Sequence, residues 1–247
     1  MNTLRIATYN IHKGVQGLGP MGRLEIHNLA QAVALMDADI ICLQEVHKFH
    51  HRHAERFVHW PQAPQAEVLA PPGYHAIYHT NAVTDHGEHG NALLSRWPVA
   101  AQRHEDMSDH RLEQRGLLHC ELQIQDHLVH TIVVHLGLFR ASRVRQLRQL
   151  CDFIGRNVPA DHPLVVAGDF NDGVALVRGM LQDCGLAPAT AEAGPTFPAL
   201  LPLVQLDHVF TRGLTPSSVH VPRGRKWWRM SDHLPLIAEF EWGSAAP

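Results

Sequence analysis

Acidic, amide and imidazole side chains recur at the points where short apolar runs of the sequence end. Asn10, Glu45, His135 and Asp169 each stand at the end of such a run. The ends of strands are the places where α/β enzymes position reactive groups. One such residue is ordinary turn chemistry, whereas a series of metal-ligating and acid–base types predicts a catalytic site.

Seven short segments carry these residues and others of the same types. They are TYN (8–10), LQEV (43–46), GNALLSRWPV (90–99), VHLG (134–137), AGDFND (167–172), LDHVF (206–210) and SDHLPL (231–236). In this order and spacing, the sequence resembles the endonuclease/exonuclease/phosphatase superfamily, the DNase I-like phosphohydrolases. The detail of YNIHKG, GNALLSRWPV and VHLGL most resembles an uncharacterised bacterial branch, some members of which are associated with phospholipid metabolism.

The resemblance implies a phosphate-ester hydrolase that depends on a divalent metal ion. The expected cofactor is Mg²⁺, for which Mn²⁺ can substitute. A hard cation of this kind needs oxygen ligands and keeps several waters. By the resemblance, Glu45 is the principal metal ligand, Asn10 lies beside it, and Asp232 joins the metal site.

The resemblance also implies catalytic roles, which suit the chemistry of phosphoryl transfer. Asp169 is expected to orient or deprotonate the attacking water, and Asn171 to hydrogen-bond a phosphoryl oxygen. His233 is expected to contact the phosphate while Asp207 fixes the orientation of its ring. His135 is expected to act as the general acid or as a second phosphate donor.

A further group of side chains is predicted to bind the substrate. Its members are Asn91, Arg115, Arg140, Arg143, Trp227 and Trp228. Arginine suits phosphate because its planar fork donates two parallel hydrogen bonds. The segment Arg223–Met230 combines four cations with adjacent tryptophans, which suits stacking on bases or contact with lipid headgroups. Solvated arginines and ordinary loop packing are the alternative explanations.

One position departs from the pattern of the abasic-site nucleases in this superfamily. Those enzymes carry Asn-x-Asp after the first strand, whereas this chain has Asn10-Ile11-His12. A neutral histidine is a poor substitute for a carboxylate in the oxygen shell of Mg²⁺. The departure argues against an abasic-site nuclease and favours a single-metal site or one that tolerates Mn²⁺.

The charge balance bears on the substrate. The net charge is −3, and only three of the 21 cationic residues are lysines. This disfavours a strongly basic nucleic-acid binder. The favoured substrate is a phospholipid-type or small phosphodiester, and DNA or RNA is the alternative.

No apolar run reaches the ~18 residues of a membrane span, and no secretory signal is visible. We expect a cytoplasmic protein, with contact to a membrane only at its surface.

The segment His47–His59 holds five of the chain's 21 histidines. It is compatible with a hypothesis of another class, a non-enzymatic histidine-rich protein that binds Ni²⁺, Cu²⁺ or Zn²⁺. A solvated, variable surface helix is the simpler interpretation.

The four cysteines (Cys42, Cys120, Cys151 and Cys184) are far apart and contain no CxxC pair. They are predicted to be reduced thiols, mostly buried.

The elements that must position these residues follow from hydrophobic periodicity. Strands are predicted at Thr3–Tyr9, Ile40–Leu43, Tyr74–His79, Asn91–Ser95, Gly116–Ile124, Leu128–Val134, Pro163–Gly168, Gln205–Thr211, Ser217–Val221 and Leu236–Phe240. Helices are predicted at Ile26–Met36, at Arg52–Val58 within an otherwise irregular stretch to Pro72, from an N-cap at Ser142, and around Val174–Asp183. This pattern predicts an α/β fold. The resemblance specifies it as a four-layer α/β/β/α sandwich of two mixed sheets, with residues 1–247 forming one catalytic domain.

Overall fold

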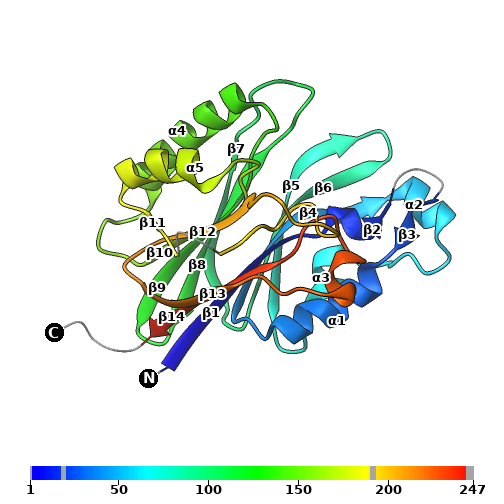
Figure 1. Ribbon diagram of the computed structural model, residues 1–247, viewed down its shortest axis with the longest axis horizontal. Helices are drawn as coiled ribbons and strands as arrows, with labels where there is room; N and C mark the ends of the chain where they lie inside the picture. Colours follow the sequence, from blue (N-terminus) through cyan, green and yellow to red (C-terminus); the bar gives the residue numbers. More distant parts are fainter. Residues whose placement is uncertain (1, 18–20, 190–192, 243–247) are drawn as a thin grey trace.

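Two six-stranded sheets lie face to face in the computed structural model, which describes residues 2–17, 21–189 and 193–242 (Figure 1). In spatial order the first sheet contains β13 (Thr215–His220), β14 (Leu236–Trp242), β1 (Asn2–Asn10), β4 (Ile40–His50), β6 (Gly87–Ser95) and β5 (His75–Thr84). The second contains β11 (Ala187–Pro188), β12 (Asp207–Arg212), β10 (Leu164–Asp169), β9 (His127–His135), β8 (Gly116–Ile124) and β7 (Val99–Asp106). Both sheets are mixed, because β1 pairs with β4 and β10 with β9 in parallel.

Helices cover the outer face of each sheet. The first sheet packs against α1 (Ile26–Met36) and α3 (Gln65–Leu69), and the second against α4 (Arg140–Asn157) and α5 (Val174–Leu181). Smaller elements lie outside these layers: α2 (His51–Arg56), α6 (Arg225–Trp228), the 3-10 turns η1 (His12–Gly14) and η3 (Gln182–Cys184), and the pair β2 (Val15–Gln16) and β3 (Arg23–Leu24). The expected four-layer α/β/β/α sandwich is confirmed. No helix among the described residues has both the length and the apolar character needed to cross a membrane.

Side-chain alternation along the strands builds three apolar cores from two sheets. On β1, Leu4 and Ile6 point into the space between the sheets, whereas Ala7 and Tyr9 point toward α1. Successive strand residues face opposite sides, so every second residue of β1 continues the inter-sheet face. The polar Asn10 therefore lies on the same face as Leu4 and Ile6, at the edge where the apolar core ends.

Several elements differ from those predicted by periodicity. The strand β7 and the helix α3 were not expected, and β4 continues to His50 through part of the stretch predicted to be irregular. The helix α4 begins at Arg140, so Ser142 lies inside it and not at its N-cap. The Ser142 hydroxyl instead donates to the Asp109 carboxylate at 2.7 Å. The Ser142 side chain therefore bonds to a residue that is distant in the sequence and does not cap the helix.

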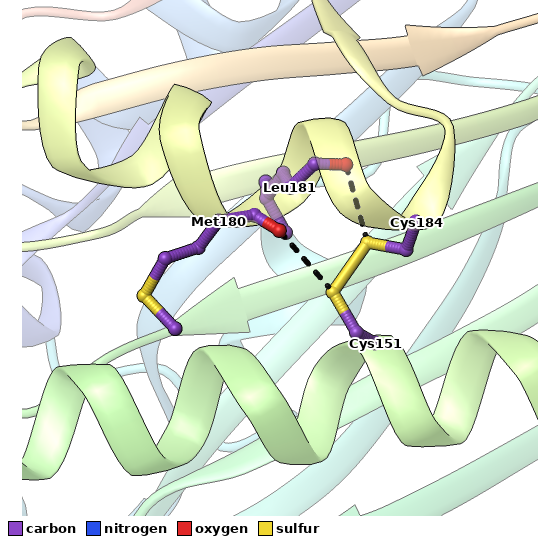
Figure 2. The surroundings of a disulfide bond; sticks show 4 residues. All are labelled: Cys151, Met180, Leu181 and Cys184. Atoms are coloured by element: carbon purple, nitrogen blue, oxygen red, sulfur yellow. Dashed lines mark hydrogen bonds between the residues drawn. A yellow bond between two sulfur atoms is a disulfide. The ribbon is translucent and has the colours of Figure 1, made fainter.

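The prediction that all four cysteines are reduced thiols is wrong for one pair. Cys42 and Cys120 are buried free thiols in the inter-sheet core. Cys151 on α4 and Cys184 on η3 form a disulfide, and their sulfur atoms lie near the carbonyl oxygens of neighbouring residues (Figure 2). The two cysteines are 33 positions apart and meet only when α4 packs beside α5 and η3, so no spacing in the sequence marks the pair.

Two glycine substitutions are expected to change stability in opposite directions. A Cβ at Gly168 would lie 1.9 Å from the Val134 carbonyl oxygen, so Gly168→Ala would push β10 away from β9. We expect a loss of about 1–3 kcal/mol or more in the free energy of unfolding. A Cβ at Gly155, inside α4, would meet no atom within 4 Å. Gly155→Ala should stabilise by up to ~1 kcal/mol, because alanine favours the helix.

Urea unfolding monitored by circular dichroism measures both changes. If Gly168→Ala proved as stable as the parent protein, the close packing of β10 on β9 would be incorrect.

Candidate active site

The register of three neighbouring strands aligns three of the predicted catalytic residues. Asp169 on β10 pairs with His135 on β9 and with Asp207 on β12. All three side chains are buried, and they extend the inter-sheet face beyond the apolar residues Val133, Ala167 and Val209. Asn10 reaches the same place from β1 of the opposite sheet, where its amide nitrogen donates to the Asp169 carboxylate at 3.0 Å. The site therefore lies where the two sheets part.

Glu45 enters the site through an irregularity in β4. The register with β6 shifts between Leu43 and Val46, and Glu45 itself has a positive φ of 56°. The shift turns the carboxylate toward Asn10, whose Nδ2 lies 3.4 Å from Glu45 Oε1.

Left-handed backbone is concentrated at this site. Of the six non-glycine residues with positive φ in the described part of the chain, four belong to it: His12, Lys13, Glu45 and Asn171. Such strained conformations persist where the surrounding structure enforces them, and they are frequent at functional sites.

Asp169 is the geometric centre of the cluster. Around its Oδ2 atom lie Asn10 Nδ2 at 3.0 Å, His233 Nε2 at 3.5 Å and His135 Nε2 at 3.7 Å. Its Oδ1 atom accepts the backbone N–H of Asn171 at 2.9 Å. The carboxylate is thereby held in one orientation, with two imidazole rings directed at the same oxygen atom.

His233 is held by a buried carboxylate. Its Nδ1 donates to Asp207 Oδ2 at 2.8 Å, which leaves Nε2 on the side of Asp169. Burial lowers the pKa of His233, but the negative charges of Asp207 and Asp169 outweigh burial and raise it to about 10. The ring of Phe197 covers the other side, with its centroid 4.9 Å from that of the imidazole.

His135 has the opposite charge state. Burial and the nearby guanidinium of Arg115 lower the pKa of His135 to about 4, in spite of the carboxylates of Asp169 and Glu45. The ring is therefore neutral at pH 7. Of the two roles expected for His135, this favours a hydrogen-bond donor to phosphate over a general acid.

The Glu45 carboxylate faces a cation that the sequence pattern did not identify. Lys13 Nζ lies 3.2 Å from Glu45 Oε2. Burial raises the pKa of Glu45, but Lys13, His135 and His12 outweigh it and hold the pKa well below its usual range. Lys13 stands three residues after Asn10 in YNIHKG. This closeness to a predicted metal-site residue is the signal that could have identified Lys13. The neighbouring residue His12 pairs with Asp232 at 3.0 Å, which raises the pKa of His12.

The Glu45 carboxylate is an oxygen ligand of the kind that a hard divalent cation prefers. Glu45 Oε2 is buried, has no hydrogen-bond donor other than the Lys13 ammonium, and lies within electrostatic range of Asp232. The Lys13 ammonium pairs with this oxygen, so a divalent cation bound here would share the Glu45 carboxylate with Lys13 or displace it. Asn10 presents Nδ2 to Glu45, while its Oδ1 accepts the His12 backbone N–H at 3.0 Å.

The three predicted arginines differ in their contacts, and two of them are engaged with protein groups. Arg115 donates to the Leu136 carbonyl at 3.2 Å and to Glu113 at 3.3 Å. Arg143 pairs with Asp172 at 2.7 Å. Arg140 is exposed at the first turn of α4.

Three other residues that were predicted to contact the substrate make contacts within the protein. The Asn91 amide donates to the carbonyls of Gly116 and Val133, so it ties β6 to the opposite sheet. Trp227 packs edge-on against Tyr9, with ring centroids 6.5 Å apart. Trp228 is half-buried, and its carbonyl accepts a hydrogen bond from Gln16.

Comparison with known proteins identifies the family of this chain. The model of the endonuclease/exonuclease/phosphatase family matches residues 7–233. The chain belongs to this family. It is 35% identical over 245 residues to the uncharacterised protein YbhP of Escherichia coli strain K12, and the alignment covers 96% of each chain.

Solved structures share the fold of this endonuclease/exonuclease/phosphatase protein. A family member from Beutenbergia cavernae superposes with a TM-score of 0.78 at 23% identity, over 98% of this chain and 72% of that one. The mannosyl-6-phosphatase Bt3783 of Bacteroides thetaiotaomicron gives a TM-score of 0.73 at 19% identity, over 97% of this chain and 100% of that one. Members of the endonuclease/exonuclease/phosphatase family are generally hydrolases of phosphate esters that use a divalent metal ion.

Replacing Asp207 should change the proton affinity of His233. The Asp207 carboxylate favours the charged imidazole, so Asp207→Asn should lower the pKa of His233 from about 10 by roughly 1–3 pH units. Titration of the histidine ring signals by NMR in metal-free protein measures the change. Asp172→Asn is the matched control, since Asp172 pairs with Arg143 and not with His233. An equal change in both variants would contradict the assignment of Asp207 as the partner of His233.

Proposed function

We propose that the protein is a metal-dependent phosphodiesterase that acts on phospholipid-type substrates, with residues 1–247 working as one catalytic domain. The family supports hydrolysis of a phosphate ester. The observation that carries the substrate class is a set of exposed apolar side chains, here called the apolar rim. They lie in the segment that follows His135 and in the turn that is hydrogen-bonded to the residues flanking His233. Large exposed apolar patches on a protein surface mark contact with a membrane or an apolar ligand.

The arrangement around Asp169 supports hydrolysis by a water molecule. Asp169 is the residue to accept a proton from the water as its oxygen attacks phosphorus and the bond to the leaving oxygen breaks. His233 and His135 direct Nε2 toward the same place, so both would donate hydrogen bonds to the phosphoryl oxygens. Asp207 holds the ring of His233 in that orientation.

Metal binding is assigned to Glu45, with Asp232 and Asn10 beside it. A bound Mg²⁺ or Mn²⁺ would neutralise charge on the phosphoryl and leaving oxygens. Lys13 lies against the same carboxylate and would supply part of this neutralisation from the protein itself. The His12–Asp232 pair leaves a single strong carboxylate ligand, Glu45, which favours one metal ion over two.

One side of the apolar rim is the turn between Thr196 and Val204. Leu200, Leu201 and Leu203 on this turn are 65–70% exposed. The turn is fixed to the catalytic segment, because Ala199 N donates to the carbonyl of Asp232 and Leu234 N to that of Thr196. Exposed leucines are therefore held next to His233 by backbone hydrogen bonds.

The other side of the rim follows β9. Leu138 and Phe139 are 65% and 64% exposed, and they come three and four residues after His135. They line a groove of about 460 Å³ together with Arg115, its partner Glu113, His89 and Leu112. A groove that combines a guanidinium with large apolar side chains suits a phosphate group that carries an apolar chain.

Nucleic acid is the second candidate, and the structure supports it less well. The segment Arg223–Met230 is basic and aromatic, but Trp227 packs edge-on against Tyr9 in the interior. It therefore offers less of a free stacking surface than the sequence suggested. A purely metal-binding, non-enzymatic protein would have no need of the His135 imidazole and the Asn10 amide at the same Asp169 oxygen.

The metal site is tested by Glu45→Gln in a substrate panel. The panel contains phospholipid vesicles, a soluble short-chain phosphodiester, a phosphate monoester and single-stranded oligonucleotides, each with Mg²⁺ or Mn²⁺. We expect Glu45→Gln to lower the initial rate on the best substrate by at least ~10², because the principal metal ligand is lost. Glu105→Gln, which alters an exposed pair with Arg156, is the control and should keep the parent rate. A Glu45 variant within tenfold of the parent would sink the assignment.

The apolar rim is tested by Leu201→Ser combined with Leu203→Ser. Each leucine that enters a membrane contributes ~1.5–3 kcal/mol, so the double variant should turn over vesicle-bound substrate at least ~10-fold more slowly. Its rate on the soluble phosphodiester should be unchanged. Leu35→Ser on α1, where Leu35 is 58% exposed, is the matched control. Equal losses on vesicles and on the soluble ester, or preferred cleavage of oligonucleotides, would contradict a lipid substrate.

A further inference from the structure

Three histidines meet where β4 ends and α2 begins. One ring nitrogen from each of His47, His50 and His53 lies within 4.8 Å of the others. We propose that these residues form a second metal site, which binds one divalent d-block cation such as Zn²⁺ and is separate from the site at Glu45. The His47–His59 segment would then contain a metal site and would not be only a solvated helix.

Two buried ring nitrogens without partners support this proposal. His47 is 3% exposed, and its Nδ1 donates to the Glu88 carbonyl at 3.1 Å. The proton is therefore on Nδ1, and the lone pair on Nε2 is buried without a hydrogen-bond donor. His53 Nδ1 is likewise buried without a partner. An unpaired buried acceptor costs free energy, and coordination to a metal ion would offset that cost.

His50 would supply the third nitrogen by exchanging its hydrogen bond from the His53 backbone for a bond to the metal ion. Its ring stacks on that of His53 with centroids 3.9 Å apart, and its Nδ1 accepts the His53 backbone N–H at 3.1 Å. This hydrogen bond caps the six-residue helix α2. A metal bond to His50 would replace the cap and hold the start of the same helix.

The donor set decides which metals fit. Three imidazole nitrogens suit Zn²⁺, Cu²⁺ or Ni²⁺ and are poor ligands for Mg²⁺, which takes oxygen. Zn–N bonds of 2.0–2.1 Å in a tetrahedron place the nitrogens about 3.4 Å apart. Small rotations of the half-exposed rings of His50 and His53 would close the present separation of up to 4.8 Å. Three protein ligands leave one position open.

Neighbouring aromatic rings pack against the buried side of the site. The rings of Trp60 and His89 pack against His47, with centroid distances of 6.0 Å and 5.8 Å. Burial and the neighbouring ring of His50 lower the pKa of His53 to about 4, so that its ring is neutral at pH 7, the form that binds metal.

The second site is linked to the first by a chain of hydrogen bonds. The His47 backbone N–H donates to Gln65 Oε1 at 2.9 Å, and Gln65 Nε2 donates to the Lys13 carbonyl at 2.8 Å. Lys13 in turn pairs with Glu45. A cation on the three histidines would therefore clamp α2 onto β4 and brace the loop that presents Lys13.

Calorimetry of the whole chain with Zn²⁺ in saturating Mg²⁺ tests the proposal. We expect one equivalent of Zn²⁺ to bind the parent protein, and Co²⁺ in its place to give the visible absorption of a nitrogen-ligated ion. His53→Ala should weaken Zn²⁺ binding at least ~10-fold. His51→Ala, an exposed histidine of the same helix that is not one of the three, should bind as the parent does.

Glu45→Gln separates this site from the catalytic one, because it should leave the Zn²⁺ affinity unchanged while it lowers hydrolysis. The proposal is overturned if the parent binds no stoichiometric Zn²⁺ in the presence of Mg²⁺, or if His53→Ala and His51→Ala behave alike. It is also overturned if Glu45→Gln abolishes Zn²⁺ binding, which would place the ion at the catalytic centre.

Discussion

The register of β10 between β9 and β12 is the constraint on which the site depends. It sets Asp169 beside His135 and Asp207, with no turn or loop to adjust their positions. A slip of β10 by one residue would turn Asp169 to the face of the sheet opposite His135 and Asp207. Gly168 secures this register, because its lack of a side chain lets β10 approach the Val134 carbonyl. The relative positions of Asp169, His135 and Asp207 are therefore fixed by the pairing of their strands.

Burial of several carboxylates in one place explains most of the remaining features. Glu45, Asp169 and Asp207 lie where the inter-sheet core meets solvent, and buried charges persist only when they are paired or hydrogen-bonded. Three groups meet this need in different ways. Lys13 faces Glu45, the charged ring of His233 bridges Asp207 and Asp169, and the Asn10 amide donates to both Glu45 and Asp169. The same excess of negative charge favours a bound divalent cation.

Parts of this arrangement follow from the sequence and parts do not. The strands that end in Asn10 and Asp169 are marked by apolar runs, and the order of the motifs indicated the fold. By contrast, the strand Val99–Asp106 lies at a sheet edge and lacks a buried apolar alternation, so periodicity missed it. Contacts between residues distant in sequence, such as the Cys151–Cys184 pair, depend on packing that no local pattern encodes. Lys13 belongs to this second class, because its role appears only when β4 lies beside β1.

The two proposed metal sites are close along β4 and differ in chemistry, which allows both to work in one protein. Glu45 and His47 are two residues apart, yet one belongs to an oxygen set faced by an ammonium and the other to an imidazole set. Zn²⁺ binds most protein ligands more tightly than Mg²⁺, so an oxygen site alone would be open to replacement by the stronger metal. A nearby set of three histidines gives such ions a better site. The Glu45 carboxylate is then left to the hard cation whose chemistry suits phosphate.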